Sequence, residues 1–206
     1  MVANGIQGVV PMISVVIATH DSERPLVPTL AALVPAAMAG VVREVIVADG
    51  GSHDGTAKVA DVAGCRFVVS PEASLGARLK ASAACARAPW LLFLKPGSVP
   101  DATWTDEANR FMQDVELGSN EGSVAAVFRR AAAMGSRRPV FVEALALLAA
   151  AVGARPSADQ GLLISKHLYQ RLGGHHADIA DPEADLLHRL GRRRIVLLRC
   201  GVVQAG

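Results

Sequence analysis

The sequence predicts a single α/β domain built on a mainly parallel central sheet, and three observations lead to this prediction. The chain has 206 residues, which is enough for one sizeable hydrophobic core and short for two. Apolar runs of strand length alternate with segments of helical pattern. The runs are continuously apolar rather than alternating, which indicates strands covered by helices on both faces, as in parallel sheets.

Each predicted element follows from one of these segments. The predicted strands are residues 13–18, 44–48, 66–70, 90–94, 123–128, 161–165 and 194–198. The predicted helices are residues 25–38, 56–62, 75–87, 101–115, 140–152, 166–172 and 182–190. An apolar stripe of Trp104, Ala108, Phe111 and Val115 indicates that its helix docks on the sheet. No repeat or linker divides the chain, so one domain is predicted over 1–206, with 1–12 as a loose tail.

Composition limits the class of partner. Aromatic residues make up only 4% of the chain and the formal net charge is +2, so nucleic acid is not an expected partner. Arginines nevertheless gather in two clusters, which can face phosphates, an anionic membrane surface or only solvent. The clusters are Arg129, Arg130, Arg137 and Arg138, and Arg189, Arg192, Arg193, Arg194 and Arg199.

Cysteine usage and the apolar segments predict a cytoplasmic location. The three cysteines share no metal-ligand spacing, and their odd number fits reduced thiols. The N-terminus lacks the basic region and apolar core of a signal peptide, and the apolar run over 140–152 is too short to span a bilayer. Peripheral contact with the inner face of the membrane through the arginine clusters is the alternative left open.

Polar residues follow the first two predicted strands. The second strand ends in VADGGSHDGT, where Asp49 and two glycines lead into a helix. Such a turn brings backbone close to a ligand, and Asp49 at the strand end can accept from a base N–H or a ribose hydroxyl. The first strand runs into Thr19, His20 and Asp21. These residues are expected beside Asp49, because neighbouring parallel strands end at the same edge of a sheet. A tight turn with a helix cap is the structural alternative.

Two further segments carry charged residues at positions suited to chemistry. The predicted strand WLLFL runs into Lys95, Pro96 and Gly97, where the lysine can hold an anion but nothing can hold a metal. Near the C-terminus a helix begins with Glu183 and Asp185 in its first turn. Acidic residues there ordinarily complement the helix dipole. The alternative is that one of them points into a cleft as a general base.

Five sequence blocks resemble the family 2 glycosyltransferases, specifically their short bacterial branch with the GT-A fold. The blocks occur in the family's order and cover nearly the whole chain. They are ISVVIATHDSE, EVIVADGGSHDGT, GARLKASAACARAPWLLFLKPGSVP, ADQGLLISKHLYQRLGG and DPEADLLHRLGRRR. The resemblance implies a three-layer GT-A-type sandwich and a single glycosyltransferase-like domain. It also implies transfer of a sugar from a nucleotide sugar to an acceptor that it does not identify.

The resemblance implies roles for individual residues. Asp49 would contact the base or ribose with Thr19 beside it, and Asp54 would support the loop. Lys80 stands where the family usually has asparagine, and Asp159 and Gln160 match the block before the acceptor side. The predicted substrate-binding residues are therefore Thr19, His20, Asp21, Asp49, Gly50, Asp54, Lys80, Lys95, Asp159 and Gln160, and the predicted catalytic residues are Glu183 and Asp185.

The chain departs from the family pattern in two places. In the family, the strand matching WLLFL leads to an acidic motif that helps hold a divalent metal on the sugar diphosphate. Here Lys95, Pro96 and Gly97 stand at those positions, so no metal ligand is predicted and Mn²⁺ or Mg²⁺ is not supported as a cofactor. The family's later acidic pair becomes Pro182 and Glu183, so the base is expected to be a glutamate.

Three functional readings follow from these departures. A lysine ammonium does part of what a divalent cation does for a leaving group, which predicts a glycosyltransferase that works without metal. The same changes fit a catalytically inactive binding or regulatory module that kept the fold. An unrelated nucleotidyl-type α/β enzyme is the third alternative.

Overall fold

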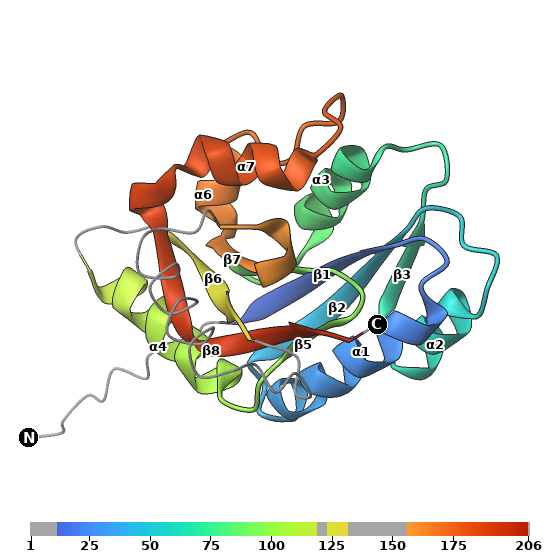
Figure 1. The fold of residues 1–206 in the computed structure, drawn as a ribbon, viewed down its shortest axis with the longest axis horizontal. Coiled ribbons are helices and arrows are strands. Elements are labelled where there is room, and N and C mark those ends of the chain that lie inside the picture. Colours follow the sequence, from blue (N-terminus) through green and yellow to red (C-terminus); the bar gives the residue numbers. More distant parts are fainter. Residues whose placement is uncertain (1–11, 119–122, 132–155, 206) are drawn as a thin grey trace, which may run out of the picture.

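An eight-stranded sheet organises the described residues of the computed structural model, which are 12–118, 123–131 and 156–205 (Figure 1). The predicted helix over 140–152, Arg137 and Arg138 lie outside these residues. The strands are β1 (Ile13–Thr19), β2 (Val42–Asp49), β3 (Arg66–Val69), β4 (Trp90–Leu94), β5 (Ser98–Pro100), β6 (Ala125–Arg130), β7 (Leu162–Ser165) and β8 (Ile195–Gln204). The helices are α1 (Glu23–Met38), α2 (Thr56–Val62), α3 (Leu75–Cys85), α4 (Trp104–Leu117), α6 (Lys166–Arg171) and α7 (Pro182–Leu190), with short 3-10 turns η1 (Ala158–Gln160) and η2 (Arg192–Arg194).

The sheet is mixed, so the prediction of a mainly parallel sheet is only partly right. The strand order is β3-β2-β1-β4-β7-β6-β8-β5. Strands β3, β2, β1 and β4 are parallel, whereas β7 runs antiparallel to both β4 and β6, and β5 runs antiparallel to β8. A short strand buried on both faces is continuously apolar in either direction, so its sequence does not encode its direction.

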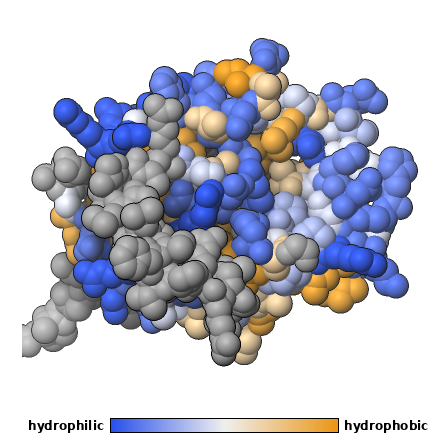
Figure 2. Space-filling model, in the orientation of Figure 1, coloured by the Kyte–Doolittle hydropathy of each residue, from blue (hydrophilic) through white to orange (hydrophobic). Residues whose placement is uncertain are grey.

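Helices cover both faces of the sheet and form the expected three layers. Helices α1, α2 and α4 lie below the sheet in Figure 1, and α3, α6 and α7 lie above it. Two buried apolar clusters fill the two spaces between helices and sheet, one with the side chains of α1 and α4 and one with those of α3, α6 and α7. The coloured part of the surface in Figure 2 is mainly hydrophilic, with apolar side chains in small separate patches.

Several predicted elements are confirmed within a few residues, and the differences have local causes. The stripe of α4 is buried as expected, and Trp104 packs edge-on against Phe128 of β6 with ring centroids 6.3 Å apart. Helix α4 begins at Trp104, later than predicted, because the Asp101 carboxylate instead accepts from the amides of Thr103 and Gly201. No helix in the described part of the chain is long and apolar enough to cross a membrane.

The sequence analysis missed strand β5, which lies directly after the turn at Gly97. The strand has three residues and contains a proline, so it carries no usable pattern. It pairs with the end of β8, and the amide of Ala205 donates to the carbonyl of Gly97 at 2.8 Å. The last strand of the chain therefore fixes the turn that follows β4.

Helix α3 packs closely on a loop near its first turn, and this contact predicts the effect of Gly76→Ala. A Cβ atom at Gly76 would lie 2.0 Å from the carbonyl oxygen of His176, a backbone atom that cannot rotate away. Alanine should stabilise the helix by about 1 kcal/mol through propensity alone. We expect the steric clash with the His176 carbonyl to outweigh this gain in helix propensity. Gly76→Ala should therefore lower the free energy of unfolding by about 1–3 kcal/mol, measured by denaturant titration.

The exposed Lys80 on the same helix provides the control. Lys80→Ala should change the free energy of unfolding by less than about 0.5 kcal/mol. A Gly76→Ala variant that is more stable than the wild type would contradict the close packing of α3 on this loop.

Candidate functional site

Thr19 and Asp49 meet at the carboxyl ends of the neighbouring parallel strands β1 and β2. They are paired in the register of β1 and β2, and the Thr19 hydroxyl Oγ1 donates to Asp49 Oδ1 at 2.7 Å. Both side chains are buried, with 2% and 1% of their surface exposed. The structure therefore brings together the two residues that the sequence predicted to be neighbours.

The protein's own donors fill the acceptor positions of Asp49. Oδ1 accepts from Thr19 and from the Ser52 hydroxyl, and Oδ2 accepts from the amides of Gly51 and Ser52 at 2.9 and 2.7 Å. A carboxylate has about four such positions. Burial alone would raise the pKa of Asp49, but the hydrogen bonds from Ser52, Thr19 and Gly51 outweigh it and lower the pKa. Asp49 is thus a buried, ionised anchor of the turn after β2.

The loops after β1 and β2 are bound to each other by reciprocal hydrogen bonds between side chains and backbone amides. The amides of Asp21, Ser22, Glu23, His53 and Gly55 donate to the side chains of Ser52, Thr56, Asp54, Asp21 and Glu23, at 2.7 to 3.0 Å. Asp21 has a φ of 45°, a left-handed conformation that aspartate tolerates better than most residues. The two loops therefore behave as one unit.

These contacts show where three of the predicted site residues lie. Asp21 and Asp54 hold the loops together through the amides of His53 and Glu23. His20 is largely exposed, and its ring lies 3.8 Å from the Asp21 carboxylate. None of the three contacts Asp49 through a hydrogen bond in the described residues.

Arg78 of α3 reaches the same strand ends, and sequence reasoning missed it. Its Nη1 donates to the carbonyls of Thr19 and Ala48 at 2.8 and 3.2 Å. A Cβ atom at Gly50 would lie 2.5 Å from this nitrogen, so the glycine leaves room for the guanidinium. Lys80, which the sequence analysis selected instead, is exposed on α3 and forms no hydrogen bond or ion pair with the described residues.

A second group, the Lys95 cluster, consists of Lys95, Asp159, Glu183 and Arg130. Lys95 follows the last residue of β4, and its ammonium donates to Asp159 Oδ1 at 2.9 Å and lies 3.5 Å from Glu183 Oε2. Arg130, at the end of β6, lies 3.5 Å from the other oxygen of Asp159. The cluster thus pairs two cations with two carboxylates.

The surroundings shift the pKa values of the Lys95 cluster in different directions. Burial would lower the pKa of Lys95, but the bond to Asp159 and the charge of Glu183 outweigh it, so its pKa is raised. Burial raises the pKa of Glu183, which Lys95 only partly opposes. The pKa of Asp159 is lowered, first by its hydrogen bond from Lys95. Glu183 is therefore the carboxylate of the cluster that binds a proton most readily.

Gln160 supports Asp159 from the turn η1. Its Oε1 accepts from the Ser157 amide and its Nε2 donates to the Phe128 carbonyl, both at 2.8 Å. Gln204 of β8 also donates to the Asp159 carbonyl at 2.9 Å. The predicted pair Asp159 and Gln160 is thus divided, with one residue in the cluster and the other holding the turn in place.

Asp185 lies apart from the cluster, although it is close to Glu183 in sequence. Its Oδ2 accepts from the Nε of Arg189 at 2.8 Å and lies 3.2 Å from the Nδ1 of His176. Arg189 in turn donates to the carbonyl of Gly174 at 2.7 Å. Asp185 therefore ties α7 to the loop after α6, and only Glu183 of the two predicted catalytic residues joins Lys95.

A cavity of about 860 Å³ adjoins the Lys95 cluster. Lys95 and Asp159 form part of its wall, and the rest comes from residues of η1, α7 and the first part of β8. Within the described residues, no group of three or more His, Cys, Asp or Glu side chains is arranged to hold a metal ion. The cluster that faces this cavity is held together by an ammonium group instead.

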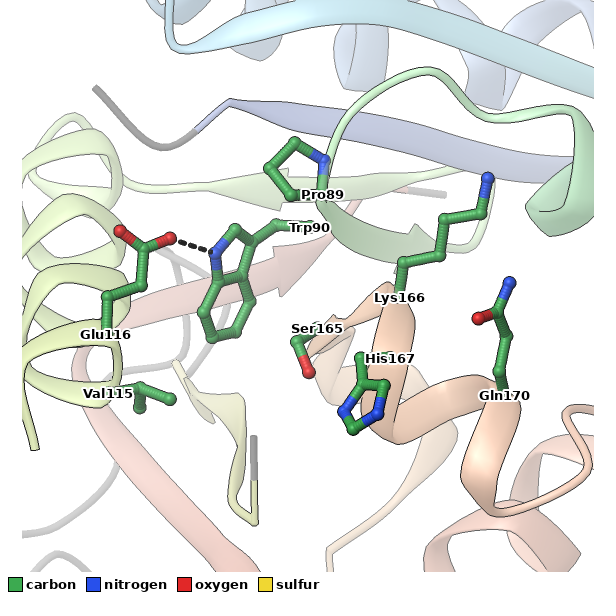
Figure 3. A pocket seen from close by; sticks show the side chains of 8 residues that line it. All are labelled: Pro89, Trp90, Val115, Glu116, Ser165, Lys166, His167 and Gln170. Carbon is green, nitrogen blue, oxygen red and sulfur yellow. Dashed lines mark hydrogen bonds between the residues drawn. The ribbon is translucent and has the colours of Figure 1, made fainter. Parts of the chain in front are cut away.

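Another cavity, of about 440 Å³, lies at the opposite end of β4 (Figure 3). Trp90 begins that strand, and its indole Nε1 donates to Glu116 Oε1 at 3.0 Å. Lys166 on the other wall donates to the carbonyls of Ala84 and Ala86. Glu116 and Lys166 in this cavity already bind other parts of the protein. The cavity also lies at the end of β4 opposite to Lys95, so we do not propose it as the functional site.

Comparison with known proteins connects this arrangement to a family. Residues 14–104 match the family described as Glycosyl transferase family 2. The predicted resemblance to the family 2 glycosyltransferases is confirmed. The matched glycosyltransferase segment contains Thr19, Asp49, Arg78 and Lys95, whereas Asp159 and Glu183 lie beyond it. A comparison with curated protein sequences gave no match.

Solved structures of glycosyltransferases share the fold of the chain. Glucosyl-3-phosphoglycerate synthase from Mycobacterium tuberculosis, in complex with Mn²⁺, UDP and glucosyl-3-phosphoglycerate, matches with a TM-score of 0.67 and 20% identity, over 95% of this chain and 72% of that chain. Its complex with Mn²⁺ and UDP-glucose gives a TM-score of 0.65 and 22% identity, over 95% and 71%. A structure described as a mycobacterial protein gives 0.67 and 24%, over 95% and 67%. The α/β fold with its mixed sheet is thus that of GT-A-like structures.

The bonding of Asp49 predicts how its removal changes stability. Asp49→Ala leaves the buried hydroxyl of Thr19 and the amides of Gly51 and Ser52 without their acceptor, so we expect a loss of about 1–3 kcal/mol at pH 7. Asp49→Asn keeps a neutral acceptor and should lose less. Both values come from denaturant titration of the free energy of unfolding.

The lowered pKa of Asp49 sets the pH dependence of this loss. The contribution of an ionised carboxylate is complete above its unfolded pKa of about 3.9 and disappears as the pH falls through the lower folded value. The difference between wild type and Asp49→Ala should therefore narrow below about pH 4. A difference that stays constant down to acid unfolding would show that the charge of Asp49 stabilises nothing.

Proposed function

We propose that the chain is a glycosyltransferase that binds a nucleotide sugar at the carboxyl ends of β1, β2 and β4 and transfers the sugar to an acceptor. The Lys95 cluster is the observation that carries this proposal, because it places an ammonium and a proton-accepting carboxylate at one strand end beside a large cavity. The family match and the UDP-glucose bound by a neighbour of the same fold support it.

The turn after β2 would hold the nucleoside. Asp49 has no free acceptor position in this structure, so we infer that it acts by fixing the turn. The backbone at Gly50 and Gly51 and the guanidinium of Arg78 would then meet the base or ribose. Arg78 Nε is buried and has no hydrogen-bond partner in the described part of the chain, so the guanidinium keeps donor capacity.

The Lys95 cluster would hold the diphosphate. Two of the neighbouring structures contain Mn²⁺, but the residues present here do not fit that ion, because Lys95, Pro96 and Gly97 offer no carboxylate and the ammonium already holds Asp159. An ammonium has three N–H donors, and at most two point at carboxylates. Lys95 and Arg130 would each donate hydrogen bonds to the diphosphate, although Asp159 and Glu183 balance their charges within the cluster. The diphosphate would thus be bound by side chains alone.

Glu183 would act as the general base. In the transfer, the acceptor hydroxyl attacks the anomeric carbon and a new C–O bond forms. The bond from that carbon to the diphosphate breaks, and its electron pair leaves with the nucleoside diphosphate. The hydroxyl proton passes to the Glu183 carboxylate. Burial raises the pKa of Glu183 towards the working pH, which improves a carboxylate as a base.

The first test concerns metal and Lys95. We expect the affinity for UDP and UDP-glucose, measured by calorimetry, to be nearly the same with Mn²⁺ and with EDTA. Lys95→Ala should weaken diphosphate binding about tenfold or more, because it removes a charged hydrogen bond and leaves two carboxylates facing the phosphates. Added Mn²⁺ should partly restore it, since two carboxylates and a diphosphate suffice for such an ion.

Lys58→Ala on α2 removes the same charge from an exposed position and serves as the control. It should leave the affinity unchanged. Wild-type affinity that collapses in EDTA would show that a metal, and not Lys95, holds the diphosphate.

The second test separates Glu183 from Asp185. Glu183→Gln should retain UDP-glucose binding but lose at least about a hundredfold in transfer, or in the slower transfer to water measured as UDP release. The wild-type rate should fall on the acid side as Glu183 takes up a proton. Asp185→Asn should lower the unfolding temperature and leave the rate per folded molecule nearly intact.

The outcomes of this test also distinguish the alternative function. A wild-type protein that binds the nucleotide sugar but releases no UDP with any acceptor would support an inactive binding module. Loss of transfer in Asp185→Asn with full activity in Glu183→Gln would show that Asp185, and not Glu183, is the general base.

A further inference from the structure

The cavity beside the Lys95 cluster has one wall that the proposed transfer does not use. Lys95, Asp159 and Ala158 lie on the side of the cluster, and His188, Gly191, Arg192 and Ile195 line the side formed by α7 and β8. A molecule bound in this cavity would therefore lie between Lys95 and the residues at the end of α7 and the start of β8.

The acidic side chains that line the cavity have hydrogen-bond partners, whereas the basic side chains His188 and Arg192 do not within the described residues. Asp159 is bound to Lys95 at 2.9 Å, and Asp181 caps α7 by accepting from the Ala184 amide at 2.9 Å. His188 and Arg192 form no hydrogen bond or ion pair through their side chains with other described residues. The wall near the end of α7 and the start of β8 thus presents the charge of Arg192, while Asp181 lies at the other end of α7 and Asp159 is paired with Lys95.

The backbone at the end of α7 determines which arginine lines the cavity. Gly191 ends the helix with a φ of 78°, and the turn η2 follows directly. Arg192, Arg193 and Arg194 are all exposed in this turn, but only Arg192 lines the cavity. A guanidinium in such a position can donate two parallel hydrogen bonds to a phosphate or carboxylate.

We infer that this cavity binds an anionic group of the acceptor, a phosphate monoester or a carboxylate, through Arg192 with His188 beside it. That the bound anion belongs to the sugar acceptor rests on the proposed function. The existence of an anion site rests only on the cavity and the charged residues that line it. The anion would sit on the wall of α7 and β8, and the hydroxyl that receives the sugar would point across the cavity to Lys95, which is paired with Glu183.

The anionic group can belong to a soluble metabolite or to a lipid headgroup, and one pair of variants distinguishes these sources from general surface attraction. Val196 and Leu197, next to the arginines, are 42% and 50% exposed, which suits contact with a membrane. Attraction to an anionic membrane depends on the summed charge near the surface. Arg192→Ser and Arg193→Ser change that sum equally, but only Arg192→Ser changes the cavity.

The experiment measures binding of glycerol phosphate to the full chain by calorimetry, with glycerol as the uncharged probe. Sedimentation with phosphatidic acid and phosphatidylcholine vesicles tests the lipid source. We expect Arg192→Ser to weaken glycerol phosphate or phosphatidic acid binding about tenfold or more, and Arg193→Ser to weaken it less than about threefold. Glycerol and phosphatidylcholine should not bind. The probe that shows the Arg192-specific loss identifies the source.

Equal losses in the two variants, or no binding of either anionic probe by the wild type, would overturn the inference. Thermal unfolding and UDP binding of both variants show that each is folded. A wild type that binds glycerol phosphate but neither UDP nor UDP-glucose would refute the proposed transferase and leave the anion site standing. The two proposals therefore fail separately.

Discussion

The hydrogen bonds received by Asp49 hold the ends of β1 and β2 at one edge of the sheet, and the rest of the site depends on them. Thr19, Gly51 and Ser52 donate to one buried carboxylate, so two loops distant in sequence share a single anchor. The reciprocal bonds between these loops then build outward from it. Arg78 closes the same edge by binding the last carbonyls of both strands. The strand ends are therefore rigid before any ligand arrives.

The end of β4 is held by ion pairs between side chains from four distant segments, and not by a single buried carboxylate. Lys95, Arg130, Asp159 and Glu183 balance one another in charge, and each is only partly removed from water. Ion pairs with this exposure contribute little to stability. The cluster is notable for its position, because it holds an ammonium at the end of β4 beside a cavity.

Local patterns accounted for most of the fold, and the reasons for the exceptions are physical. The continuous apolar runs predicted the buried strands, because burial on both faces removes alternation. The direction of β7 has no such signature, and a three-residue strand containing Pro100 has too few positions to show a period. The residues of the candidate site also fall into those that local sequence patterns predict and those that they do not. Thr19 and Asp49 were predictable because parallel register places strand ends together.

The pairing of Lys95 with Asp159 depends on a tertiary contact across 64 positions, which no local pattern contains. Arg78 was missed because a cation in a helix resembles a solvated surface residue. Glu183 and Asp185, by contrast, could have been separated in advance. Residues two apart in a helix point about 200° away from each other, so only one of them can face a cleft. Helix geometry alone therefore predicts that Glu183 and Asp185 have different surroundings.

The pairing of β5 with the end of β8 affects the order in which the protein is assembled. Gln204 binds Ser98 across 106 positions, and it also holds the carbonyl of Asp159. A ribosome makes the strand ends that carry Thr19 and Asp49 early, and those contacts are local enough to form as the chain emerges. The turn that presents Lys95 must wait until Gln204 of β8 has been synthesised. In a growing chain, the turn after β2 would therefore be in place well before the turn after β4, so the Lys95 cluster would be the last part of these strand ends to be completed.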